Sequence, residues 1–147
     1  MLLHTDMSFP ENSIGELLTK LNIPFAFDAD FPRDISGIVY VEDGGVKIAV
    51  NKSDSRQRRV FSLAHELGHY KLGHIEQGAK YRISTYRYDD SNETIEETEA
   101  NYFAATLLVP RRRLVWALEQ SRSIKTIADY FGVSVPVINN RINWLGV

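Results

Sequence analysis

Residues 65–69 constrain this chain more than any other feature of its sequence. They read His-Glu-Leu-Gly-His, with two histidines four residues apart. On a helix, side chains four apart lie one turn apart on the same face, so His65 and His69 can bind one metal ion. Glu66 projects beside them and can reach a water at an open coordination position. The motif therefore predicts a helix that carries half of a hydrolytic zinc site.

Composition decides which further ligands are available. The chain of 147 residues contains no cysteine, so any zinc must be bound by histidine and carboxylate side chains. This length suits a single domain with a sizeable core, and 44% hydrophobic with 24% charged residues is ordinary for a globular protein. A formal net charge of -2 implies no general attraction to nucleic acid.

The apolar segments bear on where the protein works. The first residues lack a basic stretch followed by a long apolar run, and no later stretch approaches the length of a membrane span. We therefore expect a cytoplasmic protein that has no membrane segment.

Hydrophobic periodicity and turn residues predict an α+β fold. We expect one core over residues 1–120, which carries the zinc motif, and a helix-turn-helix-like tail over residues 121–147, packed on the same domain. Residues 77–91, which include Tyr81, Tyr86 and Tyr88, follow no clear pattern. The expected elements are a helix over 13–21, a β-hairpin of 35–41 and 46–50, a long helix capped by Ser53 or Ser55 and ended by Gly73, helices from 94 to before 110 and over 111–120, and two short helices after 123.

A catalytic zinc site needs a third protein ligand, and His74 is the nearest candidate. It follows His69 by five residues, whereas the metzincin pattern places its third histidine six residues after the second. Because that spacing fails, we expect His74 to be exposed or to support a ligand from outside the coordination sphere.

The acidic cluster at residues 93–99 is the other source of a ligand. On a helical wheel Glu97 lies at one edge of the apolar arc, where it would point toward a packed helix. Glu96 lies toward the other edge and is the fallback, while Glu99 projects to nearly the opposite side. We predict Glu97 as the third ligand and expect Asn101, one turn later, to hydrogen-bond a ligating histidine.

Two blocks of this sequence resemble the ImmA/IrrE-type zinc metallopeptidases. Residues 59–70 read Arg-Val-Phe-Ser-Leu-Ala-His-Glu-Leu-Gly-His-Tyr, and residues 97–110 read Glu-Thr-Glu-Ala-Asn-Tyr-Phe-Ala-Ala-Thr-Leu-Leu-Val-Pro. The hairpin of residues 35–51 is similar to the family's segment before the zinc helix, so the resemblance covers about residues 35–110. Val109 replaces the methionine that is common before that proline, which is a minor departure.

The resemblance implies a mostly helical metallopeptidase domain with a small antiparallel sheet before the zinc helix. It implies that His65, His69 and Glu97 bind Zn²⁺ and that Glu66 is the catalytic base. Four side chains are candidate donors to the oxyanion of a peptidase: His74, Tyr81, Tyr86 and Tyr88.

By the same resemblance, the substrate is a specific regulatory protein such as an XRE-type helix-turn-helix repressor. Such repressors are often encoded nearby in mobile elements, and cleaving one derepresses transcription. The alternatives are a regulator that sequesters its partner or contacts DNA without proteolysis, and a toxin–antitoxin component. The presence of Glu66 beside the ligands favours an enzyme, because a binding module needs no base.

The segment of residues 123–145 resembles a helix-turn-helix. Small and apolar residues fall where such a motif packs, and Ser134 can cap its second helix. Because the chain is close to neutral, we expect this segment to pack or to bind a partner, with direct DNA binding as the less favoured alternative. The candidates for DNA contacts are Asn139, Asn140, Arg141 and Asn143, with Arg111, Arg112, Arg113, Arg122 and Lys125 as further phosphate contacts.

Overall fold

The structure is a computed structural model that describes residues 9–42, 44–75, 81–85 and 94–147. Over these residues the chain is α+β, which confirms the expected fold class. Its elements in order are helix α1 (Phe9–Lys20), strands β1 (Phe25–Ala29), β2 (Ile35–Glu42) and β3 (Gly45–Asn51), helix α2 (Arg56–Lys71), strand β4 (Tyr81–Thr85), and helices α3 (Ile95–Leu108), α4 (Arg111–Gln120), α5 (Ile124–Phe131) and α6 (Val135–Leu145).

The sheet has the strand order β1-β3-β2-β4 and is mixed. Strands β2 and β3 form the predicted antiparallel hairpin, with Glu42 opposite Gly45 at its end. Strand β1, which the sequence pattern did not indicate, runs parallel to β3 because the chain reverses direction before β2 and again before β3. The parallel pair of β1 and β3 means that the sheet is not wholly antiparallel. Strand β4 pairs with β2 but follows α2 in the chain, so the sheet is completed only after that helix.

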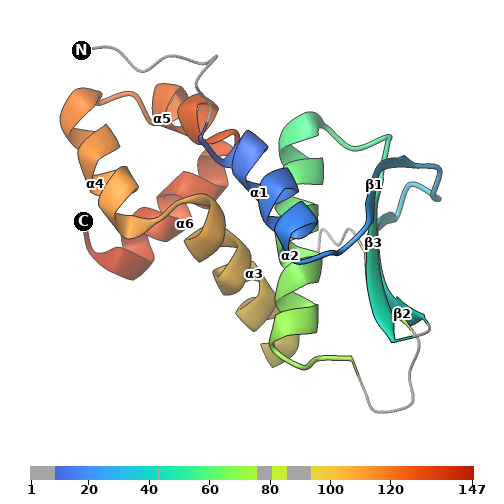
Figure 1. Ribbon diagram of the computed structural model, residues 1–147. Coiled ribbons are helices and arrows are strands. Elements are labelled where there is room, and N and C mark those ends of the chain that lie inside the picture. The colour runs from blue at the N-terminus through green and yellow to red at the C-terminus, as the bar shows by residue number, and fades with distance from the viewer. Residues whose placement is uncertain (1–8, 43, 76–80, 86–93) are drawn as a thin grey trace.

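Helix α2 lies at the centre of the molecule, with the sheet on one side and α3 crossing it on another (Figure 1). Of the two expected caps Ser55 is the one used, because its hydroxyl accepts the backbone N–H of Arg58 at 3.1 Å. The helix ends at Lys71 with Leu72 as its C-cap residue, and Gly73 follows in the left-handed region with φ 75°. Because α2 is covered on two sides, every residue from 62 to 69 is buried.

Helices α4, α5 and α6 lie on the side of α2 away from the sheet (Figure 1). Helix α5 contacts α1 and α6, and α6 also contacts α3. Phe131 and Ile138 belong to the same hydrophobic core as Leu63 and Leu67 of α2. The tail therefore shares its core with the rest of the chain, while the expected division at residue 120 stays a prediction.

Two expectations about the tail need correction. Arg141 was a candidate DNA contact, but its side chain is 3% exposed and its Nε donates to the carbonyl oxygen of Val109 at 2.9 Å. A guanidinium buried in this way caps the end of α3 and cannot reach a phosphate. Ser134 stands at the N-cap of α6, but its side chain makes no capping hydrogen bond. No helix within the described ranges is long and apolar enough to cross a membrane.

Candidate metal centre

A close crossing of α2 and α3 brings the two sequence blocks together. At Gly68, an added Cβ would lie 3.0 Å from Cδ1 and 3.2 Å from Cβ of Phe103 on α3. Such contacts are tighter than ordinary van der Waals separations, so a larger residue at this position would require Phe103 or α3 to shift by a few tenths of an ångström. The glycine inside the histidine motif thus sets the distance from which α3 presents its side chains.

Three donor atoms converge at this crossing. His65 Nε2 lies 3.0 Å from His69 Nε2 and 2.8 Å from Glu97 Oε2, and His69 Nε2 lies 3.2 Å from the same oxygen. Among the residues that the structure describes, these three form the group of side chains that could hold a metal ion. The structure therefore brings together the three residues predicted from sequence, whereas Glu96 is outside the group.

The partner of His65 determines which of its ring nitrogens carries a proton. Asn101 Oδ1 lies 2.9 Å from His65 Nδ1, as expected from the helical spacing. An amide oxygen can only accept, so Nδ1 of His65 donates. In the neutral ring, Nε2 of His65 then presents a lone pair toward His69 and Glu97.

A longer chain of contacts determines the tautomer of His69. Glu99 Oε1 lies 3.1 Å from His74 Nε2, and His74 Nδ1 lies 2.9 Å from His69 Nδ1. A carboxylate only accepts, so His74 Nε2 donates to Glu99. With the His74 ring neutral, its Nδ1 accepts from Nδ1 of His69, and this tautomer leaves the Nε2 lone pair of His69 facing the site.

The resulting donor set fits a zinc ion. Two imidazole lone pairs and a carboxylate oxygen face one another within 3.2 Å, and in the neutral tautomers no proton lies between them. Such an arrangement is repulsive unless a cation or a proton occupies it. Two nitrogens and one oxygen form a three-residue set of the kind found in catalytic zinc sites, which keep a further position for water.

The charge of Glu97 matches this role. Burial acts to raise the pKa of its carboxyl group, but His65 and His69, when protonated at the nitrogens that face it in the metal-free protein, lower the pKa more strongly through hydrogen bonds and charge. The net result is a pKa well below the usual range, so the carboxylate is ionised at neutral pH. Its side chain is 29% exposed, whereas that of His69 is fully covered.

Glu66 lies on the sheet side of the same helix. It is fully buried, and a Cβ added at Gly37 of β2 would lie 3.2 Å from its Cγ and 3.3 Å from Oε1. The absence of a side chain at Gly37 therefore makes room for the carboxylate. Its assignment as a catalytic base stays a prediction.

Two side chains support the site from outside the donor group. His74 is buried and contacts His69, which is one of the two roles expected for it; because both its ring nitrogens are engaged, it is not available to an oxyanion. Glu99 is outside the donor group, as the helical wheel indicated, but it supports the site through His74. Gly73 was the sequence feature that could have indicated the contact between His74 and His69, because a left-handed residue after a helix folds the next residue back toward the last turn. Tyr86, Tyr88 and the side chain of Tyr81 lie outside the described residues.

Comparisons with known proteins agree with this geometry. A search of curated proteins finds no match. The chain matches the peptidase family described as the IrrE N-terminal-like domain over residues 29–143, which includes both blocks of the metal centre and most of the tail. Because this match covers well over half of the sequence, the chain belongs to the IrrE N-terminal-like domain family, a family of metallopeptidase-like proteins.

Proposed function

We propose that this protein is a zinc-dependent endopeptidase that acts in the cytoplasm on a specific regulatory protein. The observation that carries the proposal is the convergence of His65 Nε2, His69 Nε2 and Glu97 Oε2 within 3.2 Å, with lone pairs facing one another. Glu66, adjacent to the first ligand on the same helix, supplies a buried carboxylate. Three ligands and a separate carboxylate are the parts that a hydrolytic zinc site requires.

Each of these side chains has a distinct task in peptide hydrolysis. A zinc ion held by His65, His69 and Glu97 would supply a Lewis acid that polarises the peptide carbonyl and lowers the pKa of a water. Glu66 accepts the proton of the attacking water and returns it to the leaving amine. Asn101 keeps the His65 ring in the tautomer that leaves Nε2 free to bind the metal.

The proposed substrate is a helix-turn-helix repressor of the XRE type, encoded near the gene of this protein. This proposal is supported by the resemblance of residues 59–70 and 97–110 to the ImmA/IrrE-type enzymes and by the family match. Cleavage of such a repressor would release the transcription that it blocks. The proteolytic site would then act as a regulatory switch.

Co-expression with the neighbouring repressor tests the proposed function. We expect the wild-type protein to yield a clipped repressor and Glu66→Gln to leave it intact, because the amide cannot accept the water's proton. The loss of rate should be about 10²- to 10⁴-fold. Zinc content of the purified Glu66→Gln protein is the control, and it should equal that of the wild type because Glu66 is not a ligand.

Two outcomes would contradict the proposal. Equal clipping by the wild type and by Glu66→Gln would show that the cleavage comes from another protease. A repressor that stays intact with the wild type but co-purifies with it would replace the peptidase by a sequestering regulator.

A further inference from the structure

The two zinc-facing histidines have different supports. His65 is held by one neutral amide, that of Asn101. His69 is held by a second histidine, His74, whose far nitrogen contacts the carboxylate of Glu99. His69 therefore has a carboxylate at the end of its chain of hydrogen bonds, whereas the contact on Nδ1 of His65 is a neutral amide.

The end of helix α2 builds this support. Gly73 has a left-handed backbone, and the backbone N–H of His74 donates to the carbonyl oxygen of His69 at 2.9 Å. This six-to-one hydrogen bond is that of a Schellman motif, which folds the chain back over the last helical turn. It brings the His74 ring against the His69 ring, with the ring centroids 5.1 Å apart.

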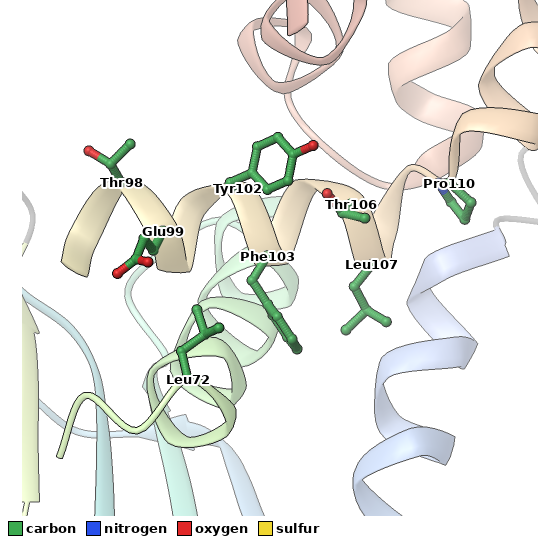
Figure 2. Close-up of a pocket in the computed structure, with 8 residues that line it drawn as sticks. All are labelled: Leu72, Thr98, Glu99, Tyr102, Phe103, Thr106, Leu107 and Pro110. Carbon is green, nitrogen blue, oxygen red and sulfur yellow. The ribbon is translucent and has the colours of Figure 1, made fainter. Parts of the chain in front are cut away.

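Glu99 completes the chain from the neighbouring helix. It stands on α3 two residues after Glu97, so its side chain leaves the helix on a different side. There it lines a mostly apolar surface groove with Leu72 and Phe103, which Figure 2 shows between the end of α2 and α3. The carboxylate is half exposed, whereas His74 is 6% exposed, so the buried imidazole connects a solvated charge to the metal centre.

We propose that His74 and Glu99 are positioning residues that fix the tautomer and orientation of His69 and so strengthen its binding of zinc. The inference rests on the proposed zinc site. Glu99 accepts from His74, His74 accepts from His69, and the Nε2 lone pair of His69 is thereby presented to the metal. A negative charge at the end of the chain makes the ligating nitrogen more basic, as carboxylates behind metal-bound histidines do in other proteins.

Zinc affinity of the metal-stripped protein, measured by competition with a chromogenic chelator, tests this proposal. We expect His74→Phe to weaken zinc binding about 10- to 100-fold, because a ring of similar size remains but no acceptor does. His74→Asn should recover most of the affinity, since its amide oxygen can take the place of Nδ1. Glu99→Ala should weaken binding, and Glu99→Gln less so because it keeps an acceptor without the charge.

Two controls separate positioning from a general loss of structure. Glu96→Gln removes the same charge from the first turn of α3 and should leave zinc affinity within about twofold of the wild type. Long-range ¹H–¹⁵N spectra should show His69 protonated at Nδ1 in the wild type and a mixture of tautomers in His74→Phe. A purely structural effect would alter the melting temperature of the metal-free proteins without changing that tautomer.

The proposal is overturned if the wild type binds zinc and His74→Phe binds it equally well. If His74→Phe does not fold, equal affinities of Glu99→Ala and the wild type overturn it. Failure of this proposal can be distinguished from failure of the proposed function. A protein that binds zinc, loses affinity in these variants and cleaves no repressor retains the positioning pair but is not a peptidase.

Discussion

The crossing of α2 with α3 and the pair α5 and α6 both carry polar side chains in a hydrophobic core, but they use them differently. At the crossing, buried His65 and His69 direct ring nitrogens at each other and at a carboxylate. In the tail, buried Arg141 directs its Nε at a backbone carbonyl. Side chains that converge on one another create a binding site, whereas a side chain that satisfies the backbone stabilises a fold.

The surface of the tail supports the same distinction. Asn139, Asn140 and Asn143 are exposed, but Lys125 is paired with Asp129 at 2.8 Å. Arg113 lies over the ring of Trp116, with its Cζ 5.3 Å from the ring centroid. Lys125 and Arg113, two of the candidates for phosphate binding, therefore already make contacts within the chain.

The largest expected effect comes from removing the ligand on α3. Glu97→Ala deletes the only carboxylate of the donor group and should weaken zinc binding by more than about 100-fold, beyond the effect of any supporting residue. Isothermal titration of the metal-free protein with zinc measures it. Affinity equal to that of the wild type would show that the crossing is only a packing contact.

A change in the tail should affect stability but not metal binding. Arg141→Ala leaves the Val109 carbonyl without its donor and opens a buried space, which should lower the free energy of unfolding by about 1–3 kcal/mol. Urea denaturation of the metal-free protein measures the loss. If the zinc affinity fell as far as it does in Glu97→Ala, the two regions would not be separable.

The spacing of the helices should have a smaller effect on the site. Gly68→Ala places a Cβ against Phe103 and must move α3 or that ring by a few tenths of an ångström. We expect zinc affinity to fall by up to about tenfold, because Glu97 moves with α3. Gly15→Ala is a matched helical-glycine control for the zinc measurement, since its added Cβ would make only an ordinary contact, 3.7 Å from Phe25 Cζ. Unchanged affinity in Gly68→Ala would mean that Phe103 yields and the helix spacing is not critical.

The smallest effect is expected on the outer face of α6. Alanine at Asn139, Asn140 and Asn143 together should change neither zinc affinity nor stability by more than about 0.5 kcal/mol, because these side chains are exposed. Repressor cleavage and binding to duplex DNA are measured in parallel. Salt-sensitive DNA binding by the wild type that this variant loses would give the tail a function of its own.

Local chemistry made much of this molecule predictable. Ser55 before α2 and Gly73 after it mark helix ends that the structure confirms, and the hairpin and α3 lie where their sequence patterns placed them. Strand β1 escaped prediction because it is short and mostly exposed at the edge of the sheet, so its sequence has little hydrophobic pattern. Its parallel pairing with β3 depends on tertiary contacts that no local pattern encodes.

The site was predictable where helical spacing applies and unpredictable where it stops. His65, His69, Glu97 and Asn101 were placed by their positions on two helices. For His74 the spacing excluded a ligand but left an exposed and a supporting role open, because the residue lies beyond the end of α2, where the left-handed Gly73 redirects the chain. The helical wheel correctly excluded Glu99 as a ligand, but a wheel of α3 alone does not show that the segment after α2 brings His74 to that side.

The central claim is that His65, His69 and Glu97 hold one zinc ion at the crossing of α2 and α3. Crystals of the zinc-loaded protein, measured at the zinc absorption edge, test it most directly. We expect one anomalous peak per chain, about 2.0–2.2 Å from His65 Nε2, His69 Nε2 and a carboxylate oxygen of Glu97. A peak elsewhere, or none at these three side chains in zinc-saturated protein, would contradict it.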